Sequence, residues 1–241
     1  MFIYRLMTIS DDFVAIIAVI IAFVLSACFA IVAHEVSHAW VAKLNGDYTA
    51  ENAGRLTLNP VAHFDPIGLL MMLLVGFGWA KPVPINPNNF TKYRRGMITV
   101  AAAGVTANLL LAGIFLLLLF LLQPLLLYAA STSTAIYFLQ ILVLYLINLS
   151  IMFNFMLALF NLLPIYPLDG YNIVASLFPQ AVGYRRFMVR YGVFVLLALI
   201  VIGNIASFAG FRYLNVFGLF GDVINKLISL VSEASVKTFL G

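Results

Sequence analysis

The sequence predicts an all-α polytopic membrane protein with about five to six transmembrane helices. Of its 241 residues, 64% are hydrophobic and only 9% are charged, and the mean hydropathy is +1.08. Soluble domains carry about 25% charged residues. Several charge-free runs exceed the roughly 20 residues that a helix needs to cross a bilayer. These observations exclude an ordinary soluble domain.

Three charge-free runs give the expected membrane helices: Phe13 to Ala33, Gly96 to Ile165 and Tyr191 to Phe211. The second run is too long for one helix, and the proline and polar residues of Gln123 to Thr134 divide it into two spans. The tail, residues 211–241, mixes apolar and charged residues. It could lie along the interface or cross once more, and the sequence leaves both open.

The apolar stretch from Pro66 to Ala80 is too short for a comfortable crossing and contains three glycines. We therefore expect a re-entrant segment packed against protein. Just before it, Arg55 to Leu58 alternates like a strand. We expect a short β-hairpin-like element there, with an edge to which an unwound peptide could pair.

We expect one membrane-embedded domain over residues 1–241, with a core at about 13–180 and additional C-terminal helices at about 185–241. Asp11 and Asp12 precede the first apolar run, which argues that this helix is retained rather than removed as a signal peptide. Cys28 is the single cysteine, so neither a disulfide framework nor a cysteine metal site is expected.

The basic residues predict the orientation in the cell membrane. They precede the spans that begin near Gly96 and Tyr191, and none lies in the Gln123 to Thr134 connection. By the positive-inside rule, the basic regions face the cytoplasm and the N-terminus lies outside. The net charge of +4 then reflects topology, so no nucleic-acid partner is expected. The basic residues concerned are Lys43, Arg55, Lys81, Lys92, Arg94, Arg95, Arg185, Arg186 and Arg190.

The most informative motif is His34-Glu35-Val36-Ser37-His38 at the end of the first apolar run. Residues four apart lie one above the other on a helix, so His34 and His38 can bind one metal ion, with Glu35 beside its bound water. Zinc lowers the pKa of such a water, and a carboxylate can take its proton. Ionisable groups within a membrane span usually mark a functional site.

Asp169 is the candidate third metal ligand, because it interrupts an otherwise uncharged stretch at the same expected depth. The prolines before it, Pro164 and Pro167, free polar backbone that membrane proteins tolerate only inside protein or along a cavity. Two alternatives stay open: Asp169 could be a helix N-cap, and Glu51 could be the third ligand, although its polar surroundings favour a solvated loop.

His63 and Asp65 form a second histidine and carboxylate pair on the cytoplasmic side. Pro60 and Pro66 flank the pair, which favours a role in shaping a turn over metal contact.

These motifs together resemble the site-2 protease family of intramembrane zinc metalloproteases. The His34 motif, the Gly104 to Asn108 element and the Asn161 to Gly170 segment appear in the family's order. Gly54 to Pro60 and Gly78 to Pro84 are similar to the compact branch without PDZ or CBS domains. The resemblance covers about Ala33 to Gly170.

The resemblance implies a function and residue roles. His34, His38 and Asp169 would bind Zn²⁺, Glu35 would act as general base and then general acid, and Asn108 and Asn161 would hold the substrate strand or the developing oxyanion. Asn108 could equally be a polar contact between helices. The implied enzyme is a zinc metalloendopeptidase that cuts transmembrane protein substrates in the lipid bilayer, with its active site near the cytoplasmic face.

Two other functions remain open at this point. Histidines and carboxylates inside helices also mark ion pathways, so a transporter for zinc or another divalent metal is possible. An inactive relative that binds membrane segments without cutting them is the other. The single visible cluster argues against the first, and the presence of Glu35 argues against the second. The sequence does not predict the oligomeric state, the substrate gate or the physiological substrate.

Overall fold

The computed structural model describes residues 12–75, 80–128 and 133–240, and these residues form helices and connecting turns. Four of their helices are long and apolar enough to cross a membrane. The prediction of an all-helical membrane protein is therefore confirmed, whereas five to six crossings stay a prediction. The four helices are α2 (Phe13–Leu44), α5 (Tyr93–Tyr128), α6 (Thr134–Asn161) and α8 (Val182–Phe208).

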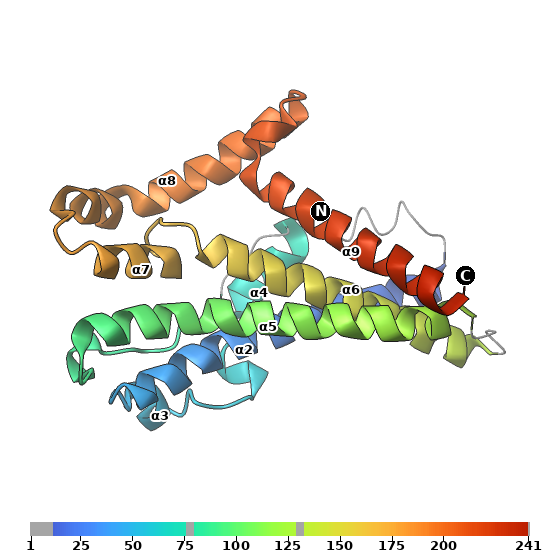
Figure 1. The fold of residues 1–241 in the computed structure, drawn as a ribbon, viewed down its shortest axis with the longest axis horizontal. Coiled ribbons are helices and arrows are strands. Elements are labelled where there is room, and N and C mark those ends of the chain that lie inside the picture. Colours follow the sequence, from blue (N-terminus) through green and yellow to red (C-terminus); the bar gives the residue numbers. More distant parts are fainter. Residues whose placement is uncertain (1–11, 76–79, 129–132, 241) are drawn as a thin grey trace.

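Helices α2, α5 and α6 lie side by side along the long axis of the molecule and pack against one another (Figure 1). Along α2, small side chains recur every fourth residue on one face, and each is 0 or 1% exposed. Small residues allow helix backbones to approach closely, as membrane bundles require. The residues of this stripe are Ala18, Ala22, Ser26 and Ala30.

The adjacent face of α2 carries large apolar side chains with the same spacing, at Ile17, Ile21, Leu25 and Phe29, which are 37 to 57% exposed. Exposed side chains of this kind are what a lipid-facing surface requires. The fourfold spacing therefore places a close-packed stripe and a lipid-facing stripe on different faces of one apolar helix.

Helix α9 (Val216–Leu240) covers α5 and α6 at the end far from α7. Ile224 packs there with Leu119, Ile147 and Ile151, all at most 3% exposed. Between α8 and α9 stands the short helix η3 (Arg212–Leu214). Helix α9 is not among the four candidate membrane helices, and its packing on α5 and α6 defines its position.

The described residues of the connection between α2 and α5 form four short helices: α3 (Thr49–Asn52), η1 (Pro60–Ala62), α4 (Pro66–Val75) and η2 (Pro87–Asn89). Phe64 and Ala80 form an isolated antiparallel bridge. The expected re-entrant segment begins as α4, but its residues 76–79 lie outside the described residues. Neither the re-entrant path nor a β-hairpin is confirmed.

Asp47 anchors this connection, although its side chain is fully buried. Its carboxylate accepts hydrogen bonds from the Asn86 backbone N–H at 2.7 Å and from the Asn89 amide at 2.8 Å. The Thr91 N–H donates to the Asn45 carbonyl at 2.9 Å. These bonds return the chain to the end of α2, where α5 begins.

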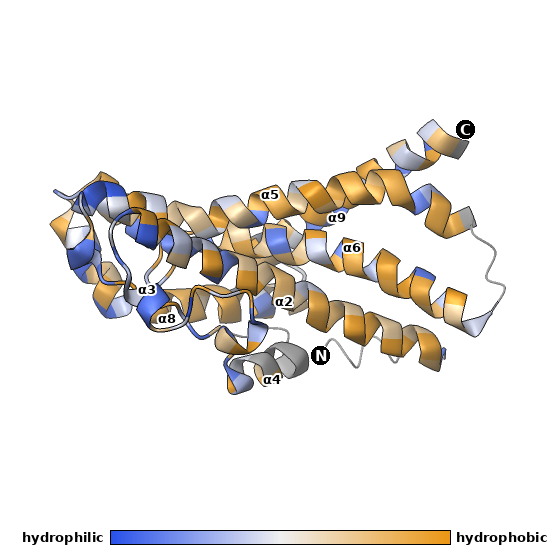
Figure 2. Ribbon diagram, turned by 90° about the horizontal axis from the view of Figure 1, so that it is seen from below, coloured by the Kyte–Doolittle hydropathy of each residue, from blue (hydrophilic) through white to orange (hydrophobic). Residues whose placement is uncertain are grey.

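The short helix α7 (Asp169–Leu177) follows the end of α6 and packs on α5. Arg94 of α5 donates to the carbonyls of Ser176 and Leu177 at 2.8 and 2.9 Å, and cations stabilise the C-terminal end of a helix. Hydrophilic residues gather at this end of the bundle, beside α3 (Figure 2). The candidate site lies toward the same end.

Candidate metal centre

His34 and His38 continue the buried stripe of α2 by the same fourfold spacing. They are 6% and 7% exposed, and their Nε2 atoms lie 3.0 Å apart. The helix therefore stacks the two imidazoles on the face that packs against α5 and α6, as the motif predicted. The lipid-facing side of α2 is not involved.

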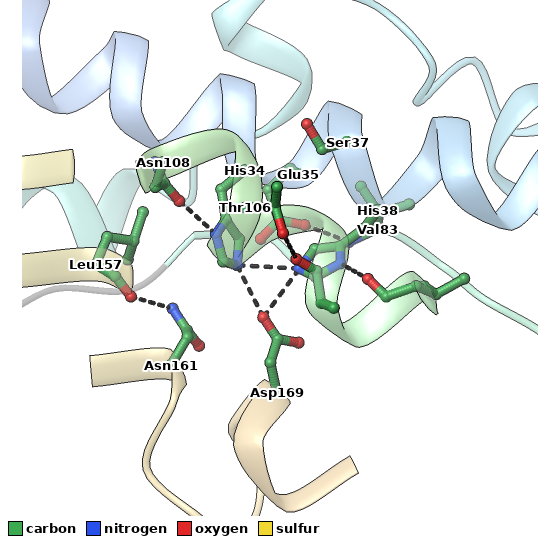
Figure 3. Close-up of polar contacts among 12 residues, drawn as sticks. His34, Glu35, Ser37, His38, Val83, Thr106, Asn108, Leu157, Asn161 and Asp169 are labelled. Carbon is green, nitrogen blue, oxygen red and sulfur yellow. Dashed lines mark hydrogen bonds and ion pairs between the residues drawn. The ribbon is translucent and has the colours of Figure 1, made fainter. Parts of the chain in front are cut away.

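Asp169 reaches the two histidines from the first turn of α7 (Figure 3). Its Oδ2 lies 3.3 Å from His34 Nε2 and 3.2 Å from His38 Nε2. Among the described residues, these three side chains are the group of histidine, cysteine and acidic residues whose ligand atoms converge, all within 4.8 Å. The fold thus brings together residues 131 positions apart (169 − 38) in the chain.

The outer nitrogens of the two imidazoles are held by acceptors. His38 Nδ1 lies 2.7 Å from the Val100 carbonyl, and His34 Nδ1 lies 2.7 Å from Asn108 Oδ1. A carbonyl or amide oxygen can only accept, so each Nδ1 carries its proton. In the neutral rings, both Nε2 lone pairs therefore point toward Asp169, and a second partner of this kind is typical of histidines that bind metals.

The donor set fits a divalent cation. Two imidazole lone pairs and a carboxylate oxygen converge, and Asp169 Oδ2 is buried without a hydrogen-bond partner. Three electron-pair donors this close repel one another unless a positive charge lies between them. Gly104 makes room for the cluster, because a Cβ there would lie 2.6 Å from both His34 Cε1 and His38 Nε2.

Glu35 follows His34 on α2 and is held by a backbone donor. Its Oε2 accepts a hydrogen bond from the Val83 N–H at 2.9 Å. Pro82 and Pro84 flank Val83 and have no N–H, so Val83 offers the single backbone donor of these three residues. One carboxylate oxygen of Glu35 is thus held by the main chain.

The two predicted substrate-binding asparagines lie in different surroundings. Asn108 is fully buried, and its amide donates to Asn154 Oδ1 at 2.8 Å and to the Ala30 carbonyl at 3.0 Å. Asn161 ends α6, is partly exposed, and donates to the Leu157 carbonyl of its own helix (Figure 3). Their roles toward a substrate stay predictions.

The residues that were alternative candidates for metal binding lie outside the cluster of His34, His38 and Asp169. Glu51 pairs with Lys43 at 2.6 Å. His63 is fully buried with Nε2 2.8 Å from the Thr57 carbonyl, and Asp65 accepts from the Gly68 N–H at 2.8 Å near the start of α4. None of the three belongs to the convergent group of ligand atoms. The turn-shaping interpretation of His63 and Asp65 agrees with these contacts.

Sequence reasoning missed Val100 and Val83, since both act through the main chain. Their side chains are apolar, so no residue type signals the role. The two prolines around Val83 were the available indication, because proline restricts the preceding residue to extended backbone and removes neighbouring donors. Asn154, one of several amide side chains in the apolar helix α6, was missed as well.

A bundle of membrane-spanning helices with two histidines, an aspartate and a glutamate in its interior is the arrangement of a membrane metalloprotease. The model of Peptidase family M50 matches residues 20–202, and the chain belongs to this family. Its resemblance to site-2 proteases is thereby confirmed. The chain is 43% identical over 172 residues to "Putative zinc metalloprotease YwhC" of Bacillus subtilis (strain 168), covering 70% of this chain and 74% of that protein. No solved structure matches.

Proposed function

We propose that this chain is an intramembrane zinc metalloprotease that hydrolyses peptide bonds within or near transmembrane segments of membrane proteins. The observation that carries the proposal is the convergence of His34, His38 and Asp169 inside a membrane-helix bundle. The proposal treats residues 1–241 as a single membrane-embedded domain. Family membership supports the peptidase chemistry.

Zinc is the cofactor of the proposed reaction, and His34, His38 and Asp169 would hold it. Two imidazoles and a carboxylate form a ligand set that catalytic zinc sites use, with a further position left for water or substrate. When bound there, zinc would polarise the scissile carbonyl and lower the pKa of its water toward neutrality.

Glu35 is the general base and then the general acid in this proposal. Its Oε2 is held by the Val83 N–H, so Oε1 would take the proton of the attacking water and deliver it to the leaving amine. Fixing one oxygen avoids the entropic cost of orienting the carboxylate during the reaction. The Val100 carbonyl and Asn108 keep the imidazoles turned toward the metal.

A transmembrane substrate would have to lose helical hydrogen bonds before cleavage, because its peptide bonds are protected by them. The chain around Val83 lies beside Glu35, and Arg55 Nη2 holds it by donating to the Lys81 carbonyl at 2.6 Å. We propose that a β-like edge from this region and Asn161 supply replacement partners. The expected re-entrant segment would lie beside them.

The orientation completes the proposal. Lys43, at the end of α2, follows His38 by five residues, or about 7 Å of helix. With the basic end in the cytoplasm and the N-terminus outside, the metal would lie shallowly below the cytoplasmic face of the cell membrane. Water could then reach Glu35 from that side.

The decisive experiment compares cleavage of a panel of model transmembrane substrates by the purified protein and by Glu35→Gln. Both proteins should contain zinc, and only the wild type should cut, because a glutamine cannot exchange the proton. Glu51→Gln is the matched control, since Glu51 lies in a solvent-facing pair with Lys43. It should cut like the wild type.

The alternative function is zinc transport, and the same experiment can distinguish it from proteolysis. If the wild type and Glu35→Gln both bind zinc, neither cuts any substrate, and zinc crosses proteoliposomes that contain the protein, the protease proposal fails. An inactive relative would bind membrane segments and show neither activity.

A further inference from the structure

A buried chain of polar side chains runs from the metal centre into the apolar bundle. Asn108 of α5, Asn154 and Ser150 of α6 and Ser26 of α2 are each 0% exposed. Burying an amide in apolar surroundings is costly unless its donors and acceptors are paired. Asn154 is the informative member, because its side chain hydrogen-bonds to Asn108 and to the Ser150 carbonyl rather than to His34 itself.

The direction of each amide follows from its partners, starting at the end far from the metal. Asn154 Nδ2 lies 2.8 Å from the Ser150 carbonyl, which can only accept. The amino group of Asn154 must therefore face Ser150, and its Oδ1 must face Asn108. Asn154 thus presents an acceptor to α5.

That acceptor and the Ala30 carbonyl fix the direction of the Asn108 amide. Its Nδ2 lies between Asn154 Oδ1 at 2.8 Å and the Ala30 carbonyl at 3.0 Å, so both of its amide protons are used. The Asn108 oxygen is then the end that faces His34 Nδ1, at 2.7 Å. A reversed Asn108 would place its amino group against His34 and its oxygen against two other oxygens.

The orientation of Asn108 decides the tautomer of His34. With an oxygen opposite Nδ1, the proton lies on Nδ1 and the Nε2 lone pair faces Asp169 and His38. With an amino group opposite Nδ1, the proton would move to Nε2 and occupy the position that a metal needs. The amide direction therefore controls whether His34 is a ligand.

We propose that Asn154 is a positioning residue of the metal centre, which holds the Asn108 amide in the direction that keeps His34 in its metal-binding tautomer. The inference rests on the proposed function, since it concerns zinc binding at that site. The Ser150 carbonyl, one turn earlier in α6, fixes the direction of the Asn154 amide.

The test measures the zinc dissociation constant of the full chain in detergent by competition with a chelator. Asn154→Leu keeps the approximate volume and removes the acceptor, and it should weaken zinc binding by about tenfold, the lower end of the effect of losing such a supporting bond. The lower end is expected because the Ala30 carbonyl still orients Asn108. Asn154→Asp should bind nearly as the wild type does, because a protonated carboxyl donates to Ser150 and accepts from Asn108.

Ser26→Ala is the matched control. Ser26 is equally buried and bonds to Ser150 Oγ and the Leu146 carbonyl, but no bond joins it to Asn108. Its loss should leave zinc affinity within about twofold of wild type while lowering the thermal stability of the protein. Asn154→Ser, too short to reach Asn108, replaces Asn154→Leu if the leucine variant does not fold, with the same loss expected.

The visible spectrum of the cobalt-substituted protein gives a second readout, since its bands respond to the ligands of the metal. The bands should change in Asn154→Leu and return in Asn154→Asp. Wild-type affinity and spectrum in Asn154→Leu would overturn the inference, as would equal zinc loss in Ser26→Ala. A wild-type protein that binds no zinc would instead overturn the proposed function.

Discussion

Gly104 is the point at which α5 passes the two histidines. A Cβ at this position would lie 2.6 Å from His38 Nε2 and 2.7 Å from His34 Nδ1, closer than carbon and nitrogen atoms approach without a bond. The same helix supplies the Val100 carbonyl and Asn108 one turn to either side. A side chain at Gly104 would therefore separate the imidazoles from their supporting acceptors.

Gly104→Ala should weaken zinc binding by about tenfold or more, because at least one imidazole must leave its position to admit the methyl group. Zinc content after dialysis against a chelator measures this loss. Gly113→Ala is the control on the same helix, since a Cβ at Gly113 meets nothing within 4 Å. Full zinc occupancy in Gly104→Ala would contradict the close approach of α5.

At the scale of elements, the turn between α6 and α7 sets the position of Asp169. A Cβ on Gly170 would lie 2.3 Å from the Leu162 carbonyl oxygen and 2.5 Å from that of Leu163, so α7 starts directly against the end of α6. Ile165 and Leu168 pack on Leu196 of α8 and hold this turn from the other side. The position of Asp169 thus depends on the packing of three helices.

Gly170→Ala should reduce zinc occupancy and cleavage together, because α7 must shift and carry Asp169 with it. Its effect on zinc should exceed that of Gly183→Ala, at the start of α8, where a Cβ meets nothing within 4 Å. Zinc analysis and the cleavage assay on the same preparations measure both effects. If Gly170→Ala kept its zinc but lost cleavage, Gly170 would not act by positioning Asp169.

The stability of the connection between α2 and α5 should depend on pH, because Asp47 can be protonated. Burial raises the pKa of this carboxyl, but hydrogen bonds from Thr49, Asn89 and Asn86 outweigh it and hold the pKa below its ordinary value of 3.8. The stabilisation is therefore present above pH 3.8 and is lost as the pH falls through the lowered pKa. The folded protein therefore favours the ionised form of Asp47.

Asp47→Asn should lower the free energy of unfolding by about 1 to 3 kcal/mol near neutral pH, because buried donors lose a charged acceptor. The difference from wild type should shrink as the pH falls below 3.8, which thermal unfolding in an acid-tolerant detergent can follow. Glu51→Gln, which alters a solvent-facing pair, should change stability little. A gap between wild type and Asp47→Asn that widened in acid would contradict the lowered pKa.

The orientation of the protein in the membrane depends on how charged residues are distributed over the whole molecule. One end of the bundle holds Lys43, Arg94 and the start of α8, and the other holds Asp12, whose carboxylate accepts from the Tyr137 hydroxyl at 2.8 Å. Helix α9 packs on α5, where Ser235 Oγ donates to the Phe120 carbonyl. Its C-terminal end, which contains Lys237, points toward that second end (Figure 1). More of these basic residues therefore lie at the first end, but the second end also has one.

Cysteine labelling in intact cells should reveal the orientation, in a background with Cys28→Ser. Asn88→Cys, on exposed η2, should react with a membrane-impermeant maleimide only after the cells are opened. Ser133→Cys, at the exposed start of α6, should react in intact cells. The reverse pattern would place the metal centre near the outer face.

The class of molecule and the chemistry available to it could be predicted from local features of the sequence. Composition alone requires an apolar environment, and a His-Glu-x-x-His pattern places two imidazoles on one face of whatever helix contains it. Asp169 was recognisable because a lone carboxylate in an uncharged stretch is costly without a function. These conclusions need only local periodicity and the cost of burying charge.

The tertiary structure decided which groups meet, because contacts between distant segments depend on how helices pack. Only the crossing of α5 over α2 explains why position 104 is glycine, and only the return of the α2 to α5 connection brings the Val83 N–H to Glu35. The directions of the Asn108 and Asn154 amides follow from carbonyl groups on α2 and α6. Main-chain donors and acceptors recur in nearly every residue, so the sequence does not indicate which of them hold His34, His38 and Glu35.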